Sequence, residues 1–277
     1  MTDGEREPFS SDFVFGLPAV GAPAVRSTDG AVAYVFTSVD AGTLETDSHI
    51  EVAPFEGGAS RRLTAGARDG APRWSPDGSQ LAFRRRADED SPSQLWLLPS
   101  DGGEATRLTD IPGGVSDHVW APDGQAIFCL ADVDPSRDEE QDGPDRPRTR
   151  EARELYYRGD TIGWRGETRT HIFRVDVADG SDEQLTGGDF NHRSLAVSPD
   201  GERLAFISDR SPRRYLRAPW GGELCVMPAV GGRVRRLVWE DVASGGTAWA
   251  PDGREIAVGR GSGGNAWAPH IYPAHAV

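Results

Sequence analysis

The sequence contains no lysine: all 30 basic residues are arginine, against 44 acidic residues and a formal net charge of −14. An acidic surface repels nucleic-acid phosphates and anionic lipid headgroups, so the charge argues against nucleic acid and membrane as partners. Acid excess without lysine is typical of halophile proteins, and the alternative is a GC-rich genome that favours arginine codons.

Cysteine and long apolar runs are also scarce. Cys129 and Cys225 each lie in an apolar, strand-like run, which predicts two buried thiols rather than a disulfide framework. The longest apolar stretch, 14–25, is interrupted by two glycines and two prolines and cannot span a bilayer. The first five residues lack the basic start and apolar core of a secretory signal. We therefore expect a cytoplasmic protein.

Glycine (34) and proline (20) are abundant, and many of them belong to an internal repeat. A Trp/Val-x-Pro-Asp-Gly segment followed by an alternating apolar run stands at 74–78, 120–124, 197–201 and 249–253, with a weaker copy at 27–30. Proline fixes the backbone for a turn, aspartate bonds back to the main chain, and glycine accepts a positive φ. Each copy therefore predicts a tight turn between two strands.

A second motif follows each turn: an apolar run, a glycine-containing turn and an Arg-Leu-Thr-like segment, at 50–64, 94–109, 171–186 and 224–237. Each unit thus holds four short strands, the content of a propeller blade, whereas a β-sandwich does not predict a shared two-part motif. We predict an all-β fold, a single β-propeller domain over 1–277. Its blades are expected near 20–66, 67–111, 112–188, 189–239 and 240–277.

The repeat is interrupted by an insertion at about 132–170, between the second and third strands of the third blade. A smaller extension, 210–220, lies at the equivalent place in the fourth blade, so both should emerge on the same face. Either these loops contact a substrate or a domain, or they are solvated loops with local packing. The candidate contact residues are Tyr156, Arg158, Trp164, Arg214 and Tyr215.

Motifs for metal binding and catalysis are incomplete. A calcium-like start at Asp132 has Arg137 and Gly143 where glycine and glutamate are required, and His270 stands without partners at zinc-like spacing. No Gly-x-Ser-x-Gly segment occurs, because Arg260 replaces the first glycine of the nearest match. We expect no metal, no cofactor and no catalytic residue.

From about 20 to 271 the sequence resembles the N-terminal propeller of the prolyl oligopeptidase family, in its branch of acylaminoacyl peptidases and dipeptidyl aminopeptidase-like enzymes. The most specific segments are 70–78, 102–109, 114–117 and, inside the insertion, 155–164. The resemblance implies a seven-bladed parent and an α/β-hydrolase domain with a Ser-Asp-His triad, which is missing or on a separate chain. It also implies that the propeller caps this serine peptidase domain and restricts access to short peptides. No position here matches the family's catalytic residues.

Two further expectations concern partners. The resemblance breaks off within the fifth unit, where an open arc of blades exposes apolar sheet faces, so we expect oligomerisation or a companion chain. TolB-like propellers share the Pro-Asp-Gly repeats, which leaves a stand-alone protein-binding scaffold as the alternative function.

Overall fold

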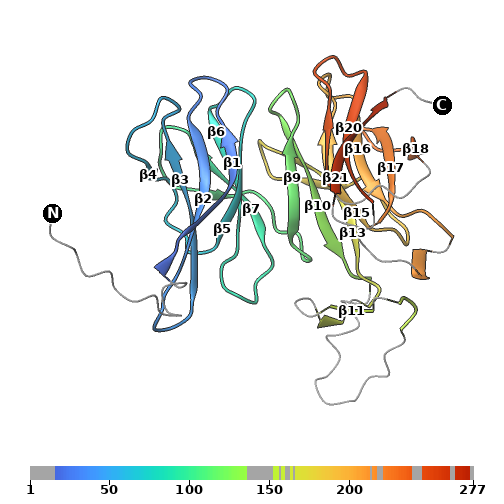
Figure 1. Ribbon diagram of the computed structural model, residues 1–277, viewed down its shortest axis with the longest axis horizontal. Helices are drawn as coiled ribbons and strands as arrows, with labels where there is room; N and C mark the ends of the chain where they lie inside the picture. The colour runs from blue at the N-terminus through green and yellow to red at the C-terminus, as the bar shows by residue number, and fades with distance from the viewer. Residues whose placement is uncertain are drawn as a thin grey trace. The chain divides into compact units, whose positions relative to one another are not determined.

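The computed structural model is built almost wholly of antiparallel β-sheets (Figure 1). Within the described ranges, no helix combines the length and apolar character that a membrane crossing requires. The described residues are 16–135, 152–155, 157–159, 163–164, 166–212, 214–216, 221–238, 245–262 and 266–274.

The chain forms two compact units, Met1–Arg107 and Leu108–Val277. The first unit holds two four-stranded sheets, ordered β1-β2-β3-β4 and β5-β6-β7-β8. Their strands are β1 (Ala19–Val25), β2 (Val32–Val39), β3 (Thr46–Ala53), β4 (Arg61–Arg62), β5 (Asp69–Trp74), β6 (Gln80–Arg85), β7 (Gln94–Pro99) and β8 (Thr106–Arg107).

The second unit holds the sheets β9-β10-β13-β14, β15-β16-β17-β18 and β19-β20-β21, and a two-stranded ribbon, β11-β12. These five antiparallel sheets of three or four strands confirm the predicted all-β architecture of propeller blades. The strands are β9 (Val115–Trp120), β10 (Ala126–Val133), β11 (Arg158–Gly159), β12 (Gly163–Trp164), β13 (Arg169–Asp176), β14 (Asp182–Gln184), β15 (His192–Val197), β16 (Arg203–Ser208), β17 (Glu223–Pro228), β18 (Arg235–Arg236), β19 (Gly245–Trp249), β20 (Glu255–Ser262) and β21 (Ala266–Pro273).

The four Pro-Asp-Gly segments form the predicted turns between the first and second strands of their sheets, and the weaker copy at 27–30 lies between β1 and β2. In the turn between β5 and β6, the carboxylate of Asp77 accepts hydrogen bonds from the Ser75 hydroxyl (2.6 Å) and the Ser79 backbone N–H (3.1 Å). Gly78 has φ of +71°, a conformation that strains any residue with a Cβ atom. The turn motif therefore fixes where the first strand of a pair ends and the second begins.

Neighbouring sheets pack through apolar faces. In the second unit, Phe128, Leu130 and Ile172 of the third blade pack against Leu204 and Phe206 of the fourth. In the first unit, a cluster that includes Ile50 and Phe83 joins its two sheets. Cys129 and Cys225 are buried free thiols, as predicted.

A β-bulge recurs in the first strand of several blades, with a non-glycine residue in the left-handed region: Ala22, Ala71 and Ser194 have φ of 49°, 49° and 56°. Beyond the bulge, a backbone carbonyl accepts a hydrogen bond from the repeat tryptophan of the next blade. The pairs are Trp74 Nε1 to Ala24 O (3.2 Å) and Trp249 Nε1 to Ala196 O (3.4 Å). The fourth blade has Val197 at this repeat position and no indole donor.

Replacing Trp74 with phenylalanine should lower the free energy of unfolding by about 1–2 kcal/mol, because the ring stays but the Ala24 carbonyl loses its donor. Urea denaturation followed by circular dichroism measures this loss. The same substitution at Trp96, whose ring stacks under Arg85 at 4.9 Å, keeps the contact and should cost less. Equal losses at the two positions would contradict a role for the indole hydrogen bond.

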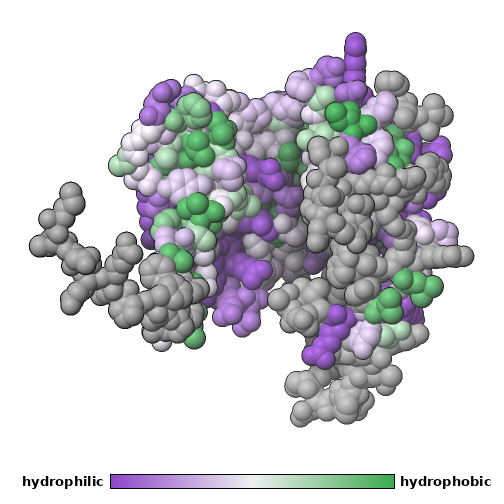
Figure 2. All heavy atoms as spheres, viewed as in Figure 1, coloured by the Kyte–Doolittle hydropathy of each residue, from purple (hydrophilic) through white to green (hydrophobic). Residues whose placement is uncertain are grey.

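Apolar side chains are exposed on the first unit. Val20 and Val25 of β1 are 70% and 63% exposed, and Figure 2 shows apolar patches on the visible face of this unit. The predicted oligomerisation through exposed blade faces stays a prediction.

Candidate functional site

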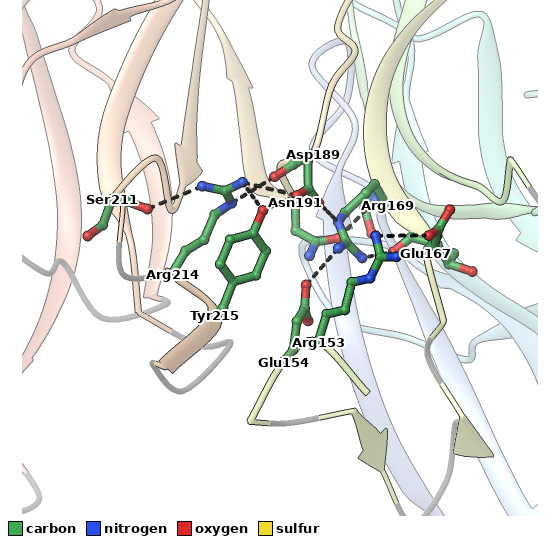
Figure 3. Close-up of polar contacts among 11 residues, drawn as sticks. Arg153, Glu154, Glu167, Arg169, Asp189, Asn191, Ser211, Arg214 and Tyr215 are labelled. Carbon is green, nitrogen blue, oxygen red and sulfur yellow. Dashed lines mark hydrogen bonds and ion pairs between the residues drawn. The ribbon is translucent and has the colours of Figure 1, made fainter. Parts of the chain in front are cut away.

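In the second unit, the loop extensions of the third and fourth blades lie in contact (Figure 3). The first extension lies between β10 and β13, and the second, which contains a 3-10 turn at Arg214–Leu216, lies between β16 and β17. The backbone N–H of Leu155, in the first extension, donates a hydrogen bond of 2.8 Å to the Tyr215 carbonyl oxygen in the second. The described parts of the two extensions, expected on one face, therefore meet in one surface.

Asp189 is the centre of this surface. It lies in the connection from β14 to β15, and its Oδ1 accepts from Arg169 Nε at 2.6 Å. Its Oδ2 accepts from Arg214 Nη2 at 3.0 Å and from the Tyr215 hydroxyl, and its backbone oxygen accepts from Arg214 Nε at 3.0 Å. One carboxylate thus binds side chains from two other segments, the start of β13 and the 3-10 turn. We call Glu154, Arg169, Asp189, Arg214 and Tyr215 the Asp189 cluster.

Residues of the insertion make further contacts with the cluster. Arg169 Nη2 donates to Glu154 Oε1 at 2.6 Å, so its guanidinium bridges two carboxylates. The next residue, Thr170, donates its hydroxyl to Asp132 Oδ1 (2.6 Å) and its backbone N–H to Asn191 Oδ1 (3.0 Å). These contacts tie the start of β13 to the connection that carries Asp189.

An aromatic ring supports the cluster. The Arg214 guanidinium lies 5.0 Å from the Phe190 ring centroid and 4.1 Å from that of Tyr215. Arg210 lies 4.4 Å from the Phe190 ring. Cation–π contacts of this kind favour a guanidinium in a fixed orientation.

The cluster is ionised and balanced at neutral pH. Burial raises the pKa of Asp189, but the hydrogen bonds from Tyr215, Arg169 and Arg214 together lower it by more. The pKa of Asp189 is therefore depressed to about 2. The same bond to Asp189 raises the pKa of Tyr215, so this residue keeps its proton as a donor. Two arginines thus face two carboxylates, Asp189 and Glu154, and the cluster presents oriented polar groups with little net charge.

Replacing Asp189 with asparagine should lower stability at pH 7 by about 1 kcal/mol, a value discounted because the side chain is 45% exposed. The depressed pKa adds stability above the unfolded value of about 4, and this contribution is lost as the pH falls from about 4 toward 2. The difference between wild type and Asp189→Asn in urea unfolding should therefore shrink below pH 4. Glu104→Gln, at an exposed carboxylate, is the control and should show no such difference. A difference that stays constant from pH 7 to pH 2.5 would contradict the assignment.

The five predicted candidate residues do not all lie together in the part of the chain that the structure describes. It brings Arg214 and Tyr215 together in the Asp189 cluster. Arg158 is exposed on β11, which pairs with β12, where the backbone of Trp164 lies. Tyr156 lies outside the described residues. The role of all five as substrate or domain contacts stays a prediction.

Sequence reasoning missed the residues that organise the cluster: Asp189, Arg169, Glu154 and Phe190. Asp189 follows Gly187-Gly188 in a connection to the first strand of the next blade, and such connections share an end of the sheet with those between second and third strands. This shared end of the sheet could have indicated from the sequence that Asp189 lies near the loop extensions. Among the described residues, no group of three or more His, Cys, Asp or Glu side chains is arranged to hold a metal ion.

Curated relatives include two peptidases. The chain is 32% identical over 204 residues to the uncharacterized peptidase YuxL of Bacillus subtilis, an alignment that covers 72% of this chain and 31% of that protein. It is 26% identical over 170 residues to dipeptidyl-peptidase 5 of Porphyromonas endodontalis, covering 55% and 24%. The chain therefore spans less than a third of the length of either relative. No protein-family model matches it.

Solved structures share the fold. The Pyrococcus horikoshii acylaminoacyl peptidase matches with a TM-score of 0.69 and 15% identity, covering 93% of this chain and 39% of that one. TolB from Acinetobacter baumannii matches with a TM-score of 0.60 and 18% identity, covering 92% and 52%.

The fold is that of a β-propeller, represented in the described residues by four four-stranded blades and one three-stranded blade. Among propellers, it resembles those of the prolyl oligopeptidase family of peptidases, as the sequence motifs predicted. TolB propellers are structural neighbours as well.

Proposed function

We propose that the chain is the propeller part of a serine exopeptidase and limits the access of peptides to an α/β-hydrolase domain outside these residues. The observation that carries this proposal is the 32% identity with a peptidase over 204 residues. The catalytic serine would belong to the hydrolase domain, and the propeller would admit short peptides and exclude long ones.

The Asp189 cluster supports this role physically. A surface that selects substrates or holds a second domain works best when its side chains are ordered in advance, because little entropy is then lost on contact. Asp189 orders Arg169, Arg214 and Tyr215 in this way. We infer that this surface, with Tyr156, Arg158 and Trp164 of the insertion, contacts peptide substrates or the hydrolase domain.

The first test uses the purified chain and an antibody raised against it. The chain alone should not hydrolyse acyl-aminoacyl or aminoacyl p-nitroanilides in high salt. In an extract of the source organism, the antibody should deplete such hydrolysis, and the precipitate should contain a polypeptide labelled by a fluorophosphonate, which reacts with catalytic serines. A precipitate with neither activity nor label would overturn the proposal. Turnover by the chain alone, blocked by a serine-directed inhibitor, would overturn the absence of a nucleophile.

In the intact enzyme, Tyr215→Ala should raise kcat/KM for a long peptide relative to a dipeptide by about tenfold, the effect of about 1.4 kcal/mol of differential interaction. The reason is that Tyr215 is held between Asp189 and Arg214 at the surface where the two extensions meet. Steady-state hydrolysis of a peptide length series measures the ratio. Arg61→Gln, on the exposed β4, is the control. An unchanged ratio would remove Tyr215 from the access path.

The second candidate function is a stand-alone protein-binding scaffold, favoured by the similarity to TolB. It predicts that the antibody precipitates a protein complex without serine-hydrolase label, so the same experiment separates the two functions.

A further inference from the structure

An arginine-rich groove of about 740 Å³ lies on the fourth blade. The lining residues that the structure describes are five arginines and four apolar residues. The arginines come from β16, β18 and the segments beside them: Arg203, Arg210, Arg233, Arg235 and Arg236.

Two of these guanidinium groups donate hydrogen bonds to backbone carbonyl oxygens. Arg235 Nη2 donates to the Ala274 carbonyl oxygen at 3.1 Å. Arg203 Nη2 donates to the Gly253 carbonyl oxygen at 3.1 Å, and its guanidinium lies 4.7 Å from the Trp249 ring. A carbonyl orients a guanidinium but does not cancel its charge, so these two groups are held in place and still attract an anion.

Arg210 supplies a second observation. Its Nε is buried and, among the described residues, has no hydrogen-bond partner. Burial lowers the pKa of this guanidinium. Because burial disfavours the charged guanidinium, an anion bound beside Arg210 in the groove would stabilise its charge.

The charge of the groove contrasts with that of the protein. None of the lining residues that the structure describes is acidic, although the chain carries 44 acidic residues and a net charge of −14. Nearby carboxylates offset part of the charge: Glu223 lies 3.4 Å from Arg236, and Asp200 lies 3.6 Å from Arg203. Arg233 and Arg235 complete the positive surface, which concentrates anions within about a Debye length.

The lining also indicates the kind of anion. The side chains of Val226, Met227 and Val234 give the groove an apolar part that an inorganic ion does not use. The described lining residues include no aromatic side chain on which a base would stack, which favours a peptide over single-stranded nucleic acid. A peptide that carries both carboxylates and apolar side chains matches both parts of the groove.

We propose that this groove binds an acidic peptide segment of a partner protein, with its carboxylates on the arginines and its apolar side chains on the floor between them. The groove shares no residue with the Asp189 cluster; the two meet at Phe190, whose ring lies against both Arg210 and Arg214. The proposed peptide binding therefore uses other side chains than the proposed peptidase role.

Fluorescence anisotropy with a fluorescein-labelled octapeptide that alternates glutamate and leucine tests the proposal, using the intact chain. The double variant Arg233→Gln, Arg235→Gln should weaken binding at least tenfold. The control, Arg61→Gln with Arg62→Gln on β4, removes two arginines from a fourth strand of the first unit and should leave binding within twofold. Because Arg235 also contacts Ala274, the exposed Arg233 is replaced alone as well and should weaken binding at least threefold.

Several results would overturn the proposal: no binding of the octapeptide, equal losses in the test and control variants, or Arg233→Gln binding as tightly as wild type. Full displacement of the peptide by an equal concentration of sulfate would reduce the groove to an inorganic-anion site. Tighter binding of a single-stranded RNA dodecamer would replace the peptide with nucleic acid as its partner.

Discussion

Phe206→Ala is expected to lower the free energy of unfolding of the second unit by about 3–5 kcal/mol. Phe206 is fully buried on β16 and belongs to the cluster that joins the third and fourth blades, where Phe128, Leu130 and Ile172 pack against it. The truncation removes a ring and leaves a cavity that rigid sheets on both sides cannot close. At this junction Val197 stands at the repeat position that is tryptophan in the second and fifth blades, so no indole donor joins the sheets there.

Urea denaturation followed by circular dichroism measures the loss, and the same substitution at Phe55 is the control. Phe55 is 69% exposed in the first unit, so Phe55→Ala should change stability by less than about 0.5 kcal/mol. A loss below about 1.5 kcal/mol for Phe206→Ala would mean that the two sheets do not share this core in solution.

Gly113→Ala should cost about 1–3 kcal/mol through a different mechanism, the collision of a new methyl group with backbone. A Cβ atom at Gly113 would stand 1.8 Å from the carbonyl oxygen of Asp132, near the end of β10. Because this obstacle is main chain, the strand must move, and Asp132 holds Thr170 beside the Asp189 cluster. We therefore expect the variant to lose both stability and the order of the cluster.

Thermal unfolding and amide hydrogen exchange measure the two effects: a lower Tm, and faster exchange in the connection that carries Asp189. Gly70→Ala is the control, because a Cβ atom there meets nothing within 4 Å, and it should leave both quantities nearly unchanged. A Gly113→Ala protein with the wild-type Tm would show that β10 and the segment before β9 are not packed this closely.

The repeat made the blades predictable because each motif acts locally. The Pro-Asp-Gly turns and the apolar runs beside them locate the strands, so the run that begins at Gln94 is strand β7. The bulges were not predictable, since alanine at position 71 gives no sign of a left-handed backbone. That conformation is imposed by the pairing of β5 with β6 around it.

The candidate site was predictable only in part, for a related reason. Arg214 and Tyr215 stand out as an arginine and an aromatic residue in a loop extension. Asp189, in contrast, is one of many acidic residues, and its importance comes from partners 20, 25 and 26 positions away. Composition does not reveal such pairings, because they depend on how two blades place their connections side by side.

The two buried thiols give each of two blades a chemical reporter of its own. Cys129 lies on β10 and Cys225 on β17, and burial raises the pKa of Cys129 strongly and that of Cys225 to about 12, so neither forms the reactive thiolate while its sheet is closed. Alkylation at neutral pH therefore has to wait until a blade opens, and each cysteine records that event for its own sheet. Mass spectrometry of the two cysteine peptides, sampled over time, would yield two opening rates from one unmodified chain. Equal rates would mean that the third and fourth blades open together, and unequal rates would identify the blade that opens first.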